Sequence, residues 1–159
     1  MELFSIRPFR ETDIDSAIEL ARNTGLSPWS RSGFHSHLES QESISLKLSH
    51  KNAEFAGFLV ARFVPGADAE RDAELLNIAV DIGFQGLRGG TILMRAFLKD
   101  CVETKAHRVW LDVRETNERA IQFYASFGFQ TVQKRRAFYS NPVEDAIIMS
   151  LDLAQIFGT

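Results

Sequence analysis

Residues 75–113, LLNIAVDIGFQGLRGGTILMRAFLKDCVETKAHRVWLDV, are the stretch that decides the fold. The apolar run 75–80 indicates a strand, and a turn with four glycines at 83–90 ends it. Apolar residues then recur at helical spacing over 92–101, and 109–113 indicates a second strand. A strand, a helix and a strand in this order predict a right-handed βαβ unit whose two strands are parallel.

Further strands and helices are predicted on both sides of this unit. Alternating apolar residues indicate strands at 2–7, 44–48, 55–64, 129–138 and 144–153. Three more helices are expected, which begin after Thr12, at Ser27-Pro28-Trp29-Ser30 and at Asn117. The sequence therefore predicts an α+β (mixed α/β) fold, with a mostly antiparallel sheet and one parallel βαβ unit at its centre.

The composition indicates one globular domain and excludes several functions. With 159 residues, 45% of them hydrophobic, the chain can bury a sizeable core, so we expect a single domain over 1–159. A net charge of −3 argues against a dedicated nucleic-acid binder. The lone Cys101 excludes an internal disulfide framework, and the four histidines share no metal-ligand spacing. Residues 1–13 lack the pattern of a signal peptide, which predicts a soluble cytoplasmic protein.

The glycine-rich turn 83–90 is a candidate anion site. Backbone N–H groups and the positive dipole end at the start of a helix favour a bound phosphate. The turn lacks the Lys-Ser or Lys-Thr pair of a Walker motif, and it is not a GxGxxG dinucleotide fingerprint. Because glycines also mark ordinary strand-to-helix turns, the spacing alone leaves both interpretations open.

A second group of polar residues follows the turn. Asp112 is a carboxylate inside an apolar strand, and Asn117 stands at the start of the next helix. Tyr124 comes seven residues later, two helical turns on, so one ligand could touch both Asn117 and Tyr124. Taken singly, Asn117 could serve only as an N-cap and Tyr124 only as part of the core.

Together these residues resemble the GNAT acetyltransferase superfamily, which uses acetyl-coenzyme A (acetyl-CoA). Within it the likeness is closest to the RimI type, the ribosomal-protein-alanine N-acetyltransferases. The resemblance runs from about Ser5 to Leu153. The residues that carry it are 5–9, Thr12, Asp13, 28–30, 76–80, 110–114, Asn117, 120–124, 127–129, 135–136, Tyr139 and 144–149. The resemblance implies a GNAT fold, in which the central parallel strands splay apart and about four helices flank the sheet.

The resemblance also implies a coenzyme site built mainly from main chain. One strand would pair with the pantetheine arm, and the glycine-rich turn would wrap the pyrophosphate. The coenzyme-binding residues so implied are Ile78, Ala79, Val80, Gln85, Gly86, Leu87, Arg88, Gly89, Gly90, Asn117 and Tyr124. Tyr124 would also be the general acid, since a phenol of pKa about 10 can protonate a leaving thiolate. No metal is implied.

The sequence departs from the family pattern at two positions. Arg88 stands where the pyrophosphate turn usually has its first glycine, so Gly86 or Gly89 could take the tight conformation, or the guanidinium could meet a phosphate. Asp112 stands where RimI-type enzymes carry a catalytic glutamate, and Glu74, where several other GNAT members place theirs, is an equal candidate for the base. Structural alternatives are a buried acceptor of backbone N–H groups for Asp112 and a solvated charge for Glu74.

Substrate recognition is less defined in the sequence. The resemblance implies that Trp29 and Tyr139 bind the substrate. Four acidic residues against Arg71 give the expected loop 68–74 a net charge of −3, which could attract a cationic peptide N-terminus or simply stay solvated.

We therefore expect direct transfer of an acetyl group from acetyl-CoA to the α-amine of a protein N-terminus, in a ternary complex. The expected substrate is the N-terminal alanine of ribosomal protein S18. The enzyme would be a monomer or weak dimer, with no direct nucleic-acid partner and no membrane partner. Two alternatives stay open: a GNAT acetyltransferase acting on a small-molecule amine, and a catalytically weak acyl-CoA-binding module.

Overall fold

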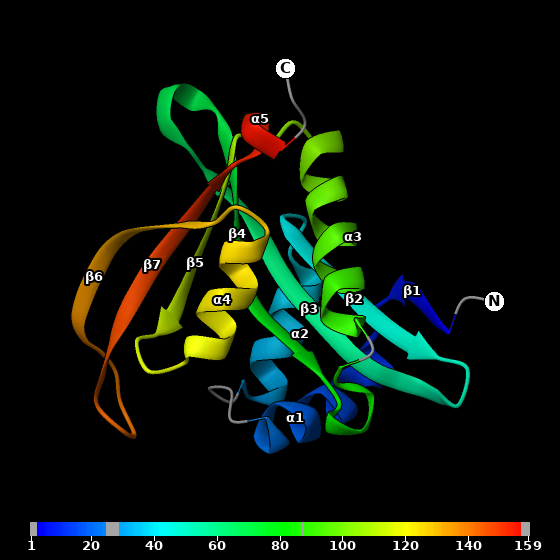
Figure 1. The fold of residues 1–159 in the computed structure, drawn as a ribbon. Coiled ribbons are helices and arrows are strands. Elements are labelled where there is room, and N and C mark those ends of the chain that lie inside the picture. The colour runs from blue at the N-terminus through cyan, green and yellow to red at the C-terminus, as the bar shows by residue number, and fades with distance from the viewer. Residues whose placement is uncertain (1–2, 25–28, 87, 157–159) are drawn as a thin grey trace.

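A computed structural model describes residues 3–24, 29–86 and 88–156 of the chain. Within them, seven strands form one mixed sheet (Figure 1). In spatial order the strands are β1 (Phe4–Pro8), β2 (Ser43–His50), β3 (Ala53–Pro65), β4 (Arg71–Val80), β5 (Arg108–Arg114), β7 (Glu144–Asp152) and β6 (Gln130–Tyr139). All neighbours are antiparallel except β4 and β5, so the predicted α+β fold is confirmed.

Helices cover both faces of the sheet, because a strand presents its side chains alternately to each side. Phe58 and Val60 of β3 pack with the first two helices, whereas Leu59 and Ala61 pack with the helices that flank β5 in sequence. The helices are α1 (Ile14–Asn23), α2 (Arg31–Glu39), α3 (Gly89–Glu103), α4 (Glu118–Ser126) and the short α5 (Leu153–Ile156). In the part of the chain that the structure describes, none is long and apolar enough to cross a membrane.

Local hydrogen bonds set where these helices begin. The N-cap Ser30 of α2 accepts the Gly33 backbone N–H at 3.0 Å, and the N-cap Asn117 of α4 accepts that of Ala120 at 3.1 Å. α3 begins differently, because none of the described side chains caps it and its N-cap Arg88 has a left-handed backbone with φ of 69°. The first N–H groups of α3 therefore keep their hydrogen-bonding capacity for a ligand.

β4 and β5 are the parallel strands of the predicted βαβ unit, and they pair over a short length. Ala73 pairs with Val109, and Glu74 pairs with Trp110. Past these residues the two strands diverge, as Figure 1 shows, and β5 continues to pair with β7 on its other side. In the described chain, the far half of β4 consequently has a strand partner only in β3. The expected splay of the central strands is confirmed.

A buried carboxylate links β4 and β5 at the end where the two strands are paired. Asp72, which is 7% exposed, accepts the Trp110 Nε1–H at 2.9 Å and the Arg108 backbone N–H at 3.2 Å. Both donors lie on β5 and the acceptor lies on β4, so these bonds tie the strands together just before they separate.

The prediction of an acidic loop over 68–74 is wrong, because β4 begins at Arg71. Asp72 is buried, Glu74 forms an ion pair with Arg62 of β3 at 3.2 Å, and Arg71 faces Glu42 at 3.7 Å. Because these charged side chains have partners on neighbouring segments, the charge-rich residues 71–74 can form the start of β4. The local charge of −3 is therefore divided among separate contacts.

Candidate active site

A cleft of about 690 Å³ opens where β4 and β5 part. Its walls come from the far half of β4, the turn before α3, the end of β5, the first turns of α4 and the end of β6. The predicted site residues that line it are Trp29, Ile78, Ala79, Val80, Gln85, Gly86, Arg88, Gly89, Gly90, Asp112, Asn117, Tyr124 and Tyr139. Glu74 is not among its lining residues, and Leu87, like Pro28, lies outside the described residues.

The turn before α3 places backbone N–H groups at one end of the cleft. Gly86 and Arg88 both have positive φ, 84° and 69°, so Arg88 itself takes the left-handed conformation that glycine usually supplies. Gly89 is already helical, and a Cβ there would come within 2.8 Å of Leu48 Cδ2. The small residue lets the start of α3 pack directly on the sheet, with its uncapped N–H groups beside the cleft.

Two arginines accompany these donors. Arg88 and Arg119 line the cleft, and within the described ranges neither has a carboxylate within 4.0 Å. Arg119 Nη1 donates to Gln85 Oε1 at 3.4 Å, and Gln85 Nε2 donates to the Val80 carbonyl at 3.2 Å. This bridge joins the start of α4 to the end of β4 at the side of the cleft that is suited to an anion.

The edge of β4 that faces the cleft offers main-chain groups to an extended ligand. Ile78, Ala79 and Val80 pair on their other edge with β3, and among the described residues no strand pairs with them on the cleft side. A free strand edge can add an extended ligand through backbone hydrogen bonds.

Asn117, the N-cap of α4, and Tyr124 within α4 both line the cleft. The Asn117 side-chain oxygen caps the helix, which leaves its amide N–H groups for other partners. Tyr124 packs edge-on against Phe123 and Phe129, with ring centroids 5.6 and 5.9 Å away. Burial, with a smaller contribution from the negative charge of Asp112, raises the pKa of Tyr124 to about 12. Its hydroxyl therefore stays protonated at neutral pH.

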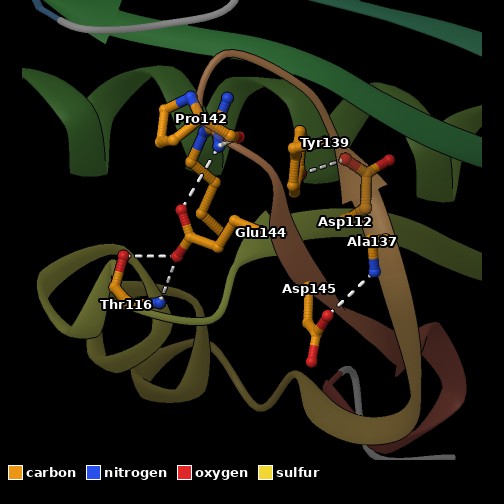
Figure 2. A network of polar contacts seen from close by, with 8 residues as sticks. Asp112, Thr116, Ala137, Tyr139, Pro142, Glu144 and Asp145 are labelled. Carbon is orange, nitrogen blue, oxygen red and sulfur yellow. Dashed lines mark hydrogen bonds and ion pairs between the residues drawn. The ribbon is translucent and has the colours of Figure 1, made fainter.

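At the opposite end of the cleft, Asp112 is held by a network from the β6–β7 hairpin (Figure 2). The Tyr139 hydroxyl donates to Asp112 Oδ1 at 2.5 Å, and the Arg114 guanidinium lies 4.3 Å from the centre of the Tyr139 ring. Arg114 Nη1 in turn contacts Glu144 Oε2 at 3.2 Å and donates to the Pro142 carbonyl at 3.2 Å. Burial first, and then the hydrogen bond to and charge of Asp112, raise the pKa of Tyr139 well above its usual range.

Trp29 lines the cleft from the segment before α2, and its surroundings also give it a packing role. Its ring lies 5.1 Å from Phe34 and 5.3 Å from His37. With the Asn77 amide turned so that its oxygen faces the indole, the Trp29 N–H donates to that oxygen at 3.2 Å and the Asn77 amide nitrogen donates to the Leu76 carbonyl at 2.9 Å. Trp29 therefore anchors the start of α2 to β4 at the wall of the cleft.

Two cleft residues, Arg114 and Arg119, were not assigned a role from the sequence. Arg119 carries a detectable signal, since a cation in the first turn of a helix opposes the helix dipole and indicates a compensating anion. For Arg114 no such signal exists, because its contacts with Tyr139 and Glu144 join strands that only the folded sheet brings together.

The strand edge, the uncapped start of α3 and the two arginines fit a transferase that takes an acyl group from coenzyme A. The sequence model of the Acetyltransferase (GNAT) family matches residues 14–129, and the chain belongs to this family. It is an acetyl-CoA-dependent N-acetyltransferase.

Relatives from bacteria span nearly the whole chain. The ribosomal protein bS18-alanine N-acetyltransferase of Escherichia coli K12 is 30% identical over 152 residues, covering 94% of this chain and 98% of the relative. That of Salmonella typhimurium LT2 is 31% identical over 145 residues, covering 90% and 93%.

Solved structures agree with this fold. The crystal structure of the Escherichia coli ribosomal-protein-S18-alanine N-acetyltransferase has a TM-score of 0.83 and 29% identity, and covers 95% of this chain and 94% of that chain. Arabidopsis thaliana NAA60 in complex with acetyl-CoA also has a TM-score of 0.83. At 16% identity, with 94% of this chain and 99% of that chain covered, it shows a likeness of fold alone.

Proposed function

We propose that the enzyme transfers the acetyl group of acetyl-CoA to the N-terminal α-amine of a protein, and that the alanine N-terminus of ribosomal protein bS18 is its substrate. The observation that carries this proposal is a single cleft that runs from the donors at the start of α3 to Asp112. The names of the bacterial relatives, which match this chain at 30 to 31% identity, support the choice of substrate.

In this proposal the coenzyme lies along the free edge of β4. The backbone of 78–80 pairs with the pantetheine arm, and the Asn117 amide binds it from the other side of the cleft. The turn 85–90 surrounds the pyrophosphate with backbone N–H groups, while Arg88 and Arg119 neutralise phosphate charge.

Asp112 is the proposed general base, in preference to Glu74. Asp112 lies in the cleft, whereas the Glu74 carboxylate is paired with Arg62 at 3.2 Å and does not line it. An N-terminal ammonium has a pKa of about 7.7–8.0, so part of the substrate is already neutral at pH 7 and a modest base acting through water is enough. Asp112→Asn should therefore lower kcat far more than Glu74→Gln, and the reverse order would move the base to Glu74.

The transfer then proceeds by direct attack. The neutral amine forms a bond to the thioester carbonyl carbon, backbone N–H groups of β4 stabilise the oxyanion, and the carbon–sulfur bond breaks. The amine proton passes to Asp112, which releases it to solvent after the transfer, and Tyr124 donates a proton to the departing sulfur and recovers one from solvent. Cys101 is no acyl carrier in this scheme, because it is buried and burial raises the pKa of its thiol to about 12.

Mass spectrometry tests the proposal. A peptide with the alanine N-terminus of bS18, incubated with the enzyme and acetyl-CoA, should gain the mass of one acetyl group, and the same peptide with a blocked α-amine should gain none. An unchanged free peptide would reject the proposed substrate. Acetylation of spermidine in place of the peptide would assign the enzyme to small-molecule amines.

A further inference from the structure

One contact in the cleft joins two residues from distant parts of the chain. Tyr139 is the last residue of β6, whereas Asp112 lies on β5, and β7 separates the two strands in the sheet. The Tyr139 ring nevertheless reaches back across the sheet, and its hydroxyl meets Asp112 Oδ1 at 2.5 Å (Figure 2).

The position of the Tyr139 ring follows from the residues around it. The guanidinium of Arg114 lies 4.3 Å from the ring centre, a cation–π distance, and Arg114 is two residues from Asp112 on the same face of β5. A ring stacked over Arg114 therefore has its hydroxyl directed along β5 toward Asp112.

Arg114 is itself fixed by the hairpin turn. It contacts Glu144 Oε2 and the Pro142 carbonyl, and Glu144 Oε1 accepts the Thr116 backbone N–H at 2.8 Å and also the Thr116 hydroxyl. Hydrogen bonds from Thr116, together with Arg114, hold the pKa of Glu144 below its usual range, so this carboxylate stays ionised. A chain of contacts thus runs from the start of α4 through the hairpin to the carboxylate in the cleft.

We propose that Tyr139 is a positioning residue for the base: its hydroxyl orients the Asp112 carboxylate, and the Arg114–Glu144 pair holds Tyr139 in place. This inference rests on the proposed function, in which Asp112 takes the amine proton. It replaces the direct substrate contact that the sequence predicted for Tyr139.

The physical basis is the freedom of an exposed aspartate. The side-chain torsion next to a carboxylate is broad, so Asp112, which is exposed on its strand, has no fixed orientation of its own. Donation from Tyr139 occupies Oδ1 and leaves Oδ2 for the amine or its bridging water. The raised pKa of Tyr139 keeps its hydroxyl protonated, so it stays a hydrogen-bond donor to Asp112.

A double-mutant cycle tests this role. Tyr139→Phe removes the hydroxyl and keeps the ring, so we expect kcat to fall about tenfold while the KM for the peptide and the affinity for CoA change little. Asp112→Asn should lower kcat by about a hundredfold or more. Because Tyr139 acts through Asp112, the double variant should be no slower than Asp112→Asn.

Three results would overturn the inference. The first is a Tyr139→Phe enzyme with unchanged kcat, the second is a raised peptide KM without loss of kcat, and the third is a double variant whose losses multiply. Thr131→Val is the matched control, since it removes a hydroxyl from the same strand at an exposed position outside the cleft lining. If Tyr139→Phe does not fold, Arg114→Gln replaces it in the cycle with the same expectations.

The assay also separates this inference from the proposed function. The cycle is run on whichever amine the wild type acetylates faster, the bS18 peptide or spermidine. A wild type that ignores the peptide rejects the proposed substrate and still allows the cycle. Full activity of Asp112→Asn rejects the base and, with it, the positioning role. If Asp112→Asn lowers kcat while Tyr139→Phe keeps full kcat, the positioning role alone is rejected.

Discussion

Tyr124 is the side chain for which the structure makes the clearest prediction about pH. An ordinary tyrosine loses its proton around pH 10, whereas burial raises the pKa of Tyr124 to about 12. A group with a raised pKa stays protonated up to that higher value, so its donor function is lost only above it. Deprotonation of Tyr124 should accordingly cause no fall in the kcat of the wild type between about pH 9 and about pH 10.5.

Substitution of Tyr124 tests its role as the acid. Tyr124→Phe keeps the ring that packs against Phe123 and Phe129, so the affinity for CoA should be retained. Removal of the proposed proton donor to the sulfur should lower kcat by about a hundredfold or more. Steady-state kinetics with a calorimetric measurement of CoA binding separates the two effects, and a fully active variant would remove Tyr124 from the mechanism.

The position of Arg119 in the cleft leads to a prediction about the affinity for the coenzyme. If it pairs with a phosphate group, Arg119→Ala should weaken CoA binding about tenfold, the value of one charge-assisted hydrogen bond. Arg95→Ala, an exposed arginine of α3 outside the cleft lining, is the matched control. Calorimetry with CoA and with 3′-dephospho-CoA identifies the phosphate that Arg119 binds. Only if Arg119 binds the 3′-phosphate should Arg119→Ala and the wild type bind 3′-dephospho-CoA with equal affinity. Equal affinity of wild type and Arg119→Ala for both ligands would contradict the assignment.

At the level of elements, Asp72 of β4 links the two parallel strands through its hydrogen bonds to β5. Asp72→Ala leaves the Trp110 indole N–H and the Arg108 amide without their acceptor, so we predict a loss of roughly 2–4 kcal/mol in the free energy of unfolding. Chemical denaturation measures it. Glu19→Ala, at an exposed position of α1, should change stability by less than about 0.5 kcal/mol. Equal midpoints for the two variants would show that Asp72 does not hold the strands.

The elements also show what the sequence can and cannot predict. The βαβ unit was predictable because 75–113 contains a clear change from strand to helical spacing. The start of β4 was not, since Asp72 and Glu74 depend on partners that are distant in the sequence, Trp110 and Arg62. Local patterns carry no information about such pairs.

The same distinction applies to the candidate site. The spacing and the family resemblance pointed to residues on the turn and at α4, and those that the structure describes line one cleft. The contact between Tyr139 and Asp112 could not be predicted, because it spans 27 positions and crosses a strand. Neighbouring hairpin residues supply the rest of the network, and this hairpin lies beyond the residues 14–129 that the family model matches.

Across the whole molecule, the position of the cleft follows from the order of the strands. β4 leaves β5 after two paired residues, and β5 then continues with β7, so the centre of the sheet opens on one side. Figure 1 shows α3 and the β6–β7 hairpin on either side of this opening, and both the start of α3 and Tyr139 line the cleft. In the proposed mechanism, the coenzyme and the amine would therefore reach a shared reaction point by separate approaches.

A crystal structure of the enzyme with bound CoA tests the central claim most directly. We predict that the pantetheine arm lies against 78–80 of β4, that the phosphates lie at the start of α3 beside Arg88 and Arg119, and that the sulfur points to Tyr124. A coenzyme bound outside the opening between β4 and β5, or one whose sulfur lies away from both Tyr124 and Asp112, would contradict the account.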